Sequence, residues 1–379
     1  MSAAASSTAA GGLAVTATSG TAARQHLEQI AAAWGALCDR AGLAPFLRPE
    51  WFRAHLEAFE PPAALRLLTV AQAGSLRAVL PLIAERAWVR GMPVRRLRAA
   101  AGHHSLRFDL VCDPGARAPV AAAIWNYLAR WPACDVLELR HVPAGGCAAA
   151  ILAAAAASGS ATGRWLSPFQ TCVADRLAPR TSRKFRAELR RTRRHLEARA
   201  PLRLDLISSA SPEALQSFFQ LEAAGWKGRA GGNAILRKPP AVRRFYQLLA
   251  SHAAARGHFV LARLCSGEHP VAMSYCLRDA HACWPIRWCY DEAYANFSPG
   301  HLLIESMLNA FGRLCIAGEP FAYERKWAPE GVPQAFLYVF PPTARGRLLH
   351  VLKCGFRPDP SRQPSDPAAA ASSPACPPA

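Results

Sequence analysis

The chain lacks the clustered cysteines of a metal site or of a disulfide framework. Its 379 residues include 12 cysteines, but no two form a Cys-x-x-Cys pair and none clusters with histidine at zinc-ligand spacing. Several cysteines occur in apolar, strand-like runs, where a free cysteine acts as a small hydrophobic residue. We therefore expect reduced thiols, no bound metal and a cytoplasmic location.

Long apolar runs are also absent. The first twenty residues, MSAAASSTAAGGLAVTATSG, have no basic segment followed by a sustained apolar core, which a signal peptide requires. The alanine-rich stretch 148–157 is shorter than the about 20 apolar residues that span a bilayer. The sequence predicts no transmembrane segment.

Acidic residues are few compared with basic ones. The chain has 26 Asp and Glu against 45 Lys and Arg, a formal charge of +19. This imbalance favours anionic partners such as CoA phosphates, nucleic acid or a membrane surface. The alternative is that genomic base composition favours arginine, because net charge alone describes only solubility and non-specific association.

Two segments carry most of the chemical information. Residues 217–246 read SFFQLEAAGWKGRAGGNAILRKPPAVRRFY, in which an apolar helical stretch leads to Glu222, a Gly-Trp-Lys-Gly turn and the pair Gly231-Gly232. Residues 287–303 read RWCYDEAYANFSPGHLL, in which a strand-like aromatic run is followed by a short loop and a helix. The first N–H groups of a helix lack partners and attract phosphate. Ser-Pro before a helix is also an ordinary start signal, so this pattern alone leaves both interpretations open.

Taken together, AGWKG, RRFY and YDEAYANFSPGHLL resemble the BioF2-like acetyltransferase domain of proteins grouped with the cellulose-biosynthesis CelD family. These proteins are related to GNAT N-acyltransferases and to FemAB-type peptidyltransferases, which have two GNAT-like halves. The resemblance is closest over residues 183–327. It implies an α+β fold with tandem GNAT-like halves and mixed central sheets flanked by helices. It also implies an acyltransferase that takes an acyl group, acetyl in the simplest case, from acyl-CoA.

The resemblance assigns candidate residues for binding acyl-CoA. Ser298, Gly300, His301 and Leu302 would hold the pyrophosphate through backbone N–H groups, and Gly300 permits close approach. Lys227 and Gly228 would face the same site, with Lys227 pairing with a phosphate or orienting the acceptor. The alternative for Lys227 is a solvated surface lysine.

Three further residues are candidates for the chemistry of transfer to an amine, which needs a base and a hydrogen-bond donor. Glu222 ends a helix beside aromatic residues, where burial would raise its pKa. Asp291 ends a strand, and Tyr290 beside it could return a proton to the thiolate. The alternatives are a helix-surface charge for Glu222, a turn or capping residue for Asp291, and packing for Tyr290. Glu324, in YERKW, departs from the relatives' pattern and its role is open.

Residues 181–200 form a basic amphipathic helix with several interpretations. It could contact RNA, since FemAB-type relatives use aminoacyl-tRNA; it could lie on an anionic membrane; or it could connect the two halves. No sequence cue favours sequence-specific nucleic-acid binding, and no stacked aromatic platform is visible. The resemblance implies a small-molecule or glycan amine acceptor. The alternatives are a tRNA-dependent peptidyltransferase and a non-catalytic scaffold in an exopolysaccharide assembly.

Element order predicts the organisation of the chain. We expect a disordered tail over 1–24, an N-terminal GNAT-like half over 25–179, the acetyltransferase domain over 180–345, and a largely disordered Pro/Ala-rich tail over 346–379. In the second half we expect a strand, two helices, three antiparallel strands, a helix and a strand. Their predicted bounds are 202–207, 211–222, 242–256, 259–264, 270–277, 282–288, 301–315 and 321–324.

Overall fold

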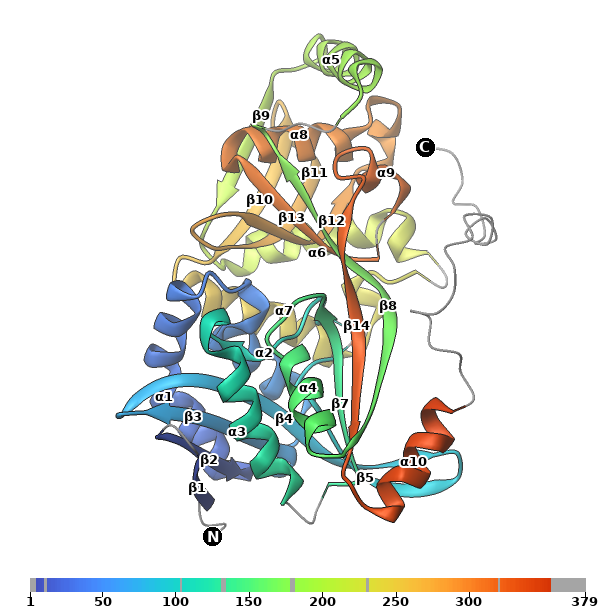
Figure 1. Ribbon diagram of the computed structural model, residues 1–379. Helices are drawn as coiled ribbons and strands as arrows, with labels where there is room; N and C mark the ends of the chain where they lie inside the picture. Colours follow the sequence, from blue (N-terminus) through green and yellow to red (C-terminus); the bar gives the residue numbers. More distant parts are fainter. Residues whose placement is uncertain are drawn as a thin grey trace. The chain divides into compact units, whose positions relative to one another are not determined.

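The computed structural model describes residues 5–9, 12–102, 104–130, 134–177, 181–229, 232–319 and 321–355. Gly231 and the tail beyond residue 355 lie outside these ranges. The described residues form two compact units (Figure 1). Among the described residues, unit 1 comprises residues up to 56, residues 60–169 and residues 333–355, and unit 2 comprises residues 57–59 and 170–332.

Unit 1 is built on a mixed sheet with the strand order β1-β2-β3-β4-β5-β7-β14-β8. β8 and β14 each begin in one unit and end in the other, so these strands link the two units along the chain. The strands of unit 1 are β1 (Ala5–Ala9), β2 (Leu13–Ser19), β3 (Leu65–Gln72), β4 (Ser75–Val89), β5 (Met92–Ala99), β6 (Val111–Cys112), β7 (Val136–Pro143), β8 (Ala161–Asp175) and β14 (Gly331–Phe340). Its helices are α1 (Gly20–Arg40), α2 (Pro49–Phe59), α3 (Arg117–Ala129), α4 (Ala149–Ala157) and α10 (Ala344–Cys354).

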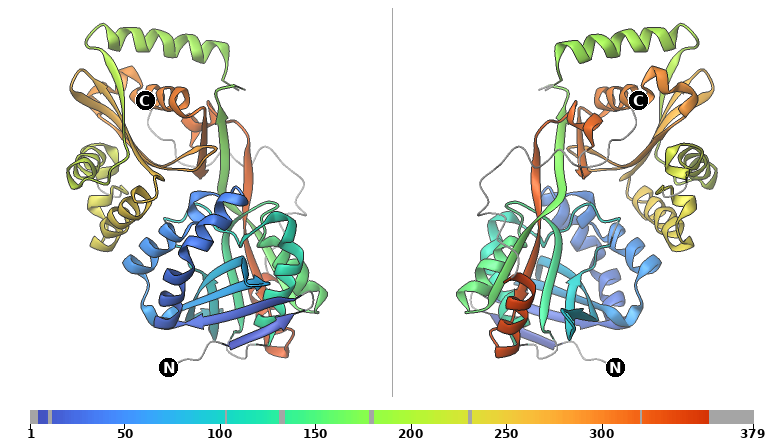
Figure 2. Two further views of the ribbon diagram at one scale, coloured as in Figure 1. Left: turned by 90° about the vertical axis from the view of Figure 1, so that its left-hand side faces the viewer. Right: turned by 90° about the vertical axis from the view of Figure 1, so that its right-hand side faces the viewer.

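Unit 2 has a second run of strands in the order β8-β13-β12-β11-β10-β9. α6 and α7 cover one face of these strands and α8 covers the other (Figure 2). The strands are β9 (Leu202–Ile207), β10 (Phe259–Ser266), β11 (His269–Arg278), β12 (Cys283–Tyr290) and β13 (Arg313–Gly318). The helices are α5 (Arg183–Glu197), α6 (Pro212–Ala224), α7 (Pro240–Ala254), α8 (Pro299–Phe311) and α9 (Ala322–Arg325).

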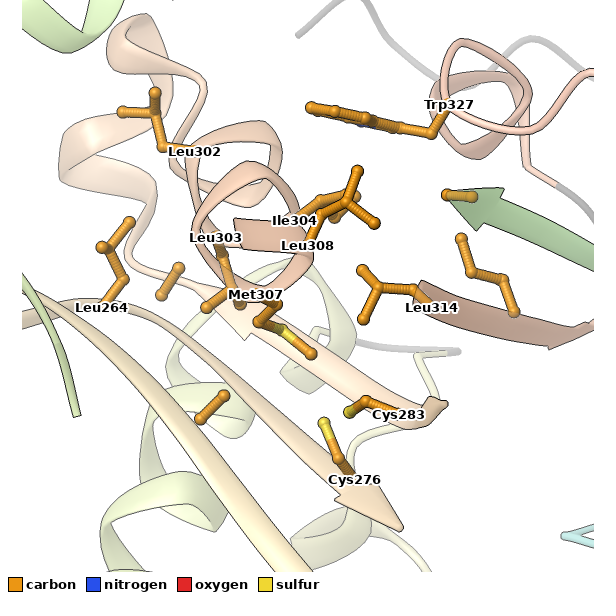
Figure 3. Close-up of a cluster of buried hydrophobic side chains, with 14 of the residues drawn as sticks. Leu264, Cys276, Cys283, Leu302, Leu303, Ile304, Met307, Leu308, Leu314 and Trp327 are labelled. Carbon is orange, nitrogen blue, oxygen red and sulfur yellow. The ribbon is translucent and has the colours of Figure 1, made fainter. Parts of the chain in front are cut away.

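The core of unit 2 lies between α8 and the strands beneath it. Leu303 and Met307 of α8 are buried, and Figure 3 shows them near Cys276 and Cys283 on the strands. These apolar side chains therefore fix α8 on the strands, and they hold in place its first turn, which follows β12 in the chain. The 11 cysteines of the described residues are all free and ten are buried, so they act as small hydrophobic residues.

The meander at the centre of unit 2 confirms the predicted α+β order. β9, β10, β11 and β12 pair antiparallel in sequence, as the alternating pattern indicates. Two predicted elements differ from the structure, the first in its end and the second in its type. The helix expected over 301–315 ends at Phe311, because Gly312 adopts a φ of 76° and the chain then forms β13. The strand expected over 321–324 is the short helix α9.

The ends of the chain also differ from expectation. Where the sequence predicts a disordered tail over 1–24, β2 pairs with β3 and α1 follows it. Where it predicts a domain end at 345 and a disordered tail beyond, β14 pairs with β7 and α10 extends to residue 354. The C-terminal segment thus returns to unit 1 instead of ending in unit 2. No helix among the described residues is long and apolar enough to cross a membrane.

Candidate active site in unit 2

Two neighbouring strands of unit 2 diverge, and the candidate site lies where they separate. β12 and β13 run parallel, and within the described ranges 283–290 and 313–318 they pair at Cys283 and Leu314, at the beginning of each strand. No further pairing between the two strands is found in these described ranges. Side chains from α6, α8 and α9 lie near the C-terminal end of β12, and their contacts define the site.

Glu222 is a buried anchor. Its side chain is 0% exposed. Oε1 accepts from Nε of Arg287 at 2.7 Å, and Oε2 accepts from the backbone N–H of Ile235 at 2.8 Å. Arg287 also donates to the carbonyl of Asn233 at 2.6 Å. Glu222 and Arg287 therefore fasten the loop after the Gly-Trp-Lys-Gly turn to β12. With both oxygens engaged, Glu222 has a positioning role in this structure.

Lys227 points from the same turn toward β12. Its side chain is 15% exposed, its Nζ donates to the carbonyl oxygen of Trp288, and Oε1 of Glu222 is 3.9 Å away. Burial lowers the pKa of Lys227, and the nearby positive charge of Arg287 lowers it further. Lys227 is therefore not a solvated surface lysine.

The glycines of this turn are required by close packing. A Cβ on Gly228 would lie 1.7 Å from the carbonyl oxygen of Ala223, and one on Gly232 would lie 2.1 Å from that of Lys227. No side chain fits at either position without moving the backbone. Gly228 thus shapes the loop that presents Lys227, and it is itself buried.

Glu324 and Tyr323 bring a second carboxyl group to the site from α9. Glu324 is 4% exposed, and its Oε1 accepts from the hydroxyl of Tyr323 at 3.1 Å. Burial raises the pKa of the Glu324 carboxyl, although the N–H of Phe321, the Tyr323 hydroxyl and the charge of Lys227 act in the opposite direction. Tyr323 packs edge-on against Trp288 with 6.1 Å between ring centroids. Trp288 thus contacts both Lys227 and Tyr323.

His301 joins α8 to this cluster. Its Nδ1 accepts from Nε1 of Trp327 at 3.0 Å, and its ring lies 5.0 Å from that of Phe185 and 6.2 Å from that of Tyr323. Burial lowers the pKa of His301 to about 4, and the charge of Lys326 contributes in the same direction. The imidazole is therefore neutral at pH 7.

This neutral imidazole predicts a loss of stability in acid. The unfolded chain binds a proton at His301 near pH 6.5, while the folded chain binds it only near pH 4. Protons therefore favour unfolding, and the free energy of unfolding is expected to fall by about 1.4 kcal/mol per pH unit across this window. Urea unfolding at about pH 7 and about pH 5 measures the loss, which should be smaller in His301→Gln than in the unmodified protein. His281→Gln, at an exposed turn position, is the matched control. Equal losses in all three proteins would contradict this account.

The first turn of α8 offers fewer unused donors than the sequence suggests. The N–H of Ser298 donates to the carbonyl of Ala295, and those of His301 and Leu302 both donate to the carbonyl of Ser298. For the N–H of Gly300 the described residues supply no backbone acceptor. A Cβ at Gly300 would meet nothing within 4 Å, so the space beside this residue is open. The pyrophosphate cradle stays a prediction, and Gly300 is its centre.

Asp291 and Tyr290 lie at the end of β12. Asp291 caps the turn that follows, its Oδ1 accepting from the N–H of Ala293 at 2.9 Å, while its Oδ2 lies 2.7 Å from Nε2 of His269. Burial alone would raise the pKa of Asp291, but these bonds hold it below its usual value. A carboxylate with a lowered pKa is a weak base, so the geometry favours a capping role. Tyr290 is half-buried and packs against the core of unit 2.

The basic helix α5 packs on α8. Leu189 and Leu196 are buried, and Arg193 donates to Glu305 at 2.8 Å. The opposite face of α5 is exposed and carries Arg183, Lys184, Arg186, Arg190, Arg191 and Arg194. The helix is thus fixed to unit 2 by its apolar stripe and presents its cations to solvent.

Comparison with a family model supports the GNAT part of the resemblance and leaves the BioF2-like, CelD-type part a prediction. Residues 183–313 match the family model described as "Acetyltransferase (GNAT) domain". This match lies within unit 2. No curated protein matches the chain. The described residues contain no group of three or more His, Cys, Asp or Glu side chains that could hold a metal ion.

Solved structures are similar to most of the chain at low sequence identity. FemX is 9% identical, with 86% of this chain and 98% of that chain covered and a TM-score of 0.56. The C-terminal DUF2156 domain of a putative lysylphosphatidylglycerol synthetase from Agrobacterium fabrum is 11% identical, with 87% and 96% covered and a TM-score of 0.50. A tandem GNAT protein from the clavulanic acid biosynthesis pathway is 15% identical, with 87% and 99% covered and a TM-score of 0.41. The predicted α+β fold, with a mixed sheet flanked by helices, is confirmed.

Proposed function

We propose that unit 2 transfers an acyl group from acyl-CoA to an amine. The supporting observation is the divergence of β12 and β13 beside the open backbone at Gly300, with a buried carboxyl group, Glu324, at the same end of the strands. A gap between two parallel strands offers unpaired backbone groups to an extended ligand. The acetyltransferase family match covers β12 and α8 and ends at Arg313, the first residue of β13.

The phosphates of CoA would lie at the first turn of α8. The N–H of Gly300 is available there, and the helix dipole adds partial positive charge. Two cations flank this turn: Arg199 lies 4.4 Å from the ring centroid of Phe297, and Lys326 lies 5.4 Å from that of Phe185. Both side chains are exposed and can move toward a phosphate. The N–H of Gly300 and the two cations therefore suit the negatively charged phosphates of CoA.

The acyl group would be transferred by direct attack. The amine nitrogen forms a bond to the thioester carbonyl carbon, the C–S bond breaks, and CoA leaves as a thiolate. Glu324, whose raised pKa suits a base, would take the proton of the amine, in place of Glu222, whose two oxygens are occupied. The pKa of Tyr323 is raised well above its usual value by burial and by Glu324, so its hydroxyl keeps its proton and would donate a hydrogen bond to the thiolate. Glu324 would then release the amine proton to the CoA thiolate or to solvent.

The acceptor is proposed only as a class. The resemblance to BioF2-like domains of the CelD family suggests an amino sugar or another polysaccharide precursor, and an acetyl group as the cargo. An exposed cationic helix next to α8 also suits an acceptor that carries negative charge. Release of CoA thiol in the presence of a panel of amino sugars tests this class.

Blocking the space at Gly300 tests the proposal directly. Because Gly300 has helical geometry and open surroundings, Gly300→Leu should fold normally but obstruct a bound pyrophosphate. Isothermal titration with acetyl-CoA should show binding to the unmodified protein and a loss of about tenfold or more in the variant. Gly35→Leu, at an equally open position in α1 of unit 1, is the matched control. Absence of binding at millimolar acetyl-CoA would remove the proposal.

The exposed cations of α5 support a second candidate, transfer of an aminoacyl group from aminoacyl-tRNA. Phosphate contacts by clustered arginines make binding strongly dependent on salt. Salt-sensitive tRNA binding that is lost when Arg190 and Arg191 become glutamate, combined with indifference to acetyl-CoA, would favour this candidate over the first.

A further inference from the structure

A pocket of about 620 Å³ lies in unit 1, outside the residues that match the acetyltransferase model. It is lined by the ends of β4 and β7, by β8 and β14, and by α10. These segments are far apart in the sequence, so the pocket exists only in the folded protein. None of its lining residues belongs to the site described in unit 2.

Aromatic rings form much of the wall. Trp165 and Tyr338 lie 4.3 Å apart between ring centroids at an angle of 60°, and Phe336 lies beside them on β14. Trp165 and Phe336 pack on a small cluster of buried apolar residues, which includes Tyr338, so this wall is anchored from behind. Trp88 lines the same pocket but is 72% exposed. An indole this exposed buries little apolar area in the protein itself and has a face available for a ligand.

A tight hairpin fixes the position of Trp88. β4 and β5 pair through Val89 and Met92, and the two residues between them, Arg90 and Gly91, have φ values of 47° and 82°. Two successive residues with positive φ form the two-residue turn that matches the twist of a hairpin. Trp88 is thus presented by a regular strand, and its exposure is not that of a loose loop.

Three cations line the pocket, and none of its lining residues among the described ones is acidic. Arg90, Arg140 and Lys353 contribute these charges. Lys353 lies with its Nζ 4.9 Å from the centroid of Tyr338. Arg140 donates to Glu138, which is 2% exposed beneath the surface and also pairs with Arg96. Glu138 holds Arg140 in place, while the charge at the mouth of the pocket stays positive.

We propose that this pocket binds a nucleotide unit, with the base stacked on Trp88 and the phosphate paired with Arg90 and Arg140. Exposed aromatic faces next to a basic surface are the combination by which proteins bind single nucleotides and single strands without reading sequence. An apolar ligand would not use the positive charge at the mouth of the pocket, and a bare anion would leave the exposed indole unused. A free nucleotide and the unpaired end of an RNA share the required chemistry.

The test uses the full-length protein and isothermal titration with four probes: adenosine monophosphate, adenosine, inorganic phosphate and a single-stranded oligouridylate of about eight residues. Adenosine monophosphate should bind at least about ten times more tightly than adenosine or phosphate, because only it supplies both ring and charge. Tighter binding of the oligonucleotide than of the mononucleotide would assign the site to RNA, and equal affinity would assign it to a free nucleotide. No binding of either nucleotide at about 5 mM would overturn the proposal.

Variants separate this pocket from the acyl-CoA site, which could also accept adenosine phosphates. Trp88→Ala should weaken nucleotide binding by about 5- to 100-fold, the range measured for loss of one stacked base, and Arg140→Glu should weaken it and reduce its salt dependence. Arg164→Ala, exposed on β8 but outside the pocket, should bind as the unmodified protein does. Gly300→Leu should keep the nucleotide binding that is lost in Trp88→Ala. Binding that is lost in Gly300→Leu and kept in Trp88→Ala would overturn the proposal while supporting the acyl-CoA site.

Discussion

Glu324→Gln is expected to lower kcat for acyl transfer by about 10²- to 10⁴-fold, the contribution of a positioned base. Glutamine keeps the shape of the side chain, and its amide oxygen can accept from the N–H of Phe321 while its amide N–H donates to the Tyr323 hydroxyl, but it cannot take a proton. Acetyl-CoA affinity should change little, because Glu324 is proposed to act on the amine and not on the carrier. The measurement is thiol release with saturating acetyl-CoA, together with titration of acetyl-CoA binding.

The pH profile distinguishes a base from a structural residue. The reaction needs Glu324 as a carboxylate, and burial raises its pKa above the usual value, so activity should fall as the pH decreases through that raised pKa. This acidic limb should vanish in Glu324→Gln. Tyr323→Phe removes a hydrogen bond that favours the carboxylate form of Glu324, so the pKa of Glu324 should rise. The acidic limb of the pH profile of this variant should therefore move to higher pH. Glu319→Gln, an exposed carboxylate near the end of β13, is the matched control and should keep the unmodified profile. An unchanged limb in Glu324→Gln would assign the base elsewhere.

The sequence predicted the parts of unit 2 that have a clear local pattern. Residues 202–207 are the strand β9 as predicted, and the three strands of the meander occur within a few residues of their expected bounds. The two motif segments do lie together, because Lys227 contacts Trp288 at the end of β12. Their chemical roles were harder to assign. Glu222 was expected to act as a base, and only the structure shows that both of its oxygens are engaged.

The residues that complete the candidate site had no local signal. β13 continues the apolar run of α8, and a short apolar run does not distinguish a helix from a strand. Without β13 the divergence from β12 cannot be inferred, and α9 is too short to show a helical period. The aromatic wall in unit 1 could not be predicted from the sequence either. It contains Trp88, Trp165 and Tyr338, which lie far apart in the sequence, and only the tertiary structure brings them to one pocket.

Removing one partner of the ion pair between Glu222 and Arg287 is expected to lower the free energy of unfolding more than breaking any other ion pair described in unit 2. Glu222→Ala leaves the guanidinium of Arg287 buried, with its side chain only 12% exposed, and removes the acceptor of the Ile235 N–H. Removing one partner of such a pair costs about 3–5 kcal/mol, because the remaining charge is not compensated. Urea unfolding of the full chain should show this loss in the transition that reports on unit 2. Glu213→Ala, exposed on the first turn of the same helix, should change stability by less than about 0.5 kcal/mol.

A double variant tests whether the cost comes from the uncompensated charge. If it does, Glu222→Leu combined with Arg287→Met should be more stable than either single variant, since replacing both ions by apolar groups removes the unpaired charge. The loop that carries Lys227 would then have lost its polar attachment to β12 through Asn233 and Ile235. We therefore expect the double variant to be folded yet to have a lower kcat, with acetyl-CoA binding at Gly300 retained. A double variant as unstable as the sum of the two single ones would show that the two residues act independently, and that their ion pair does not fasten the loop.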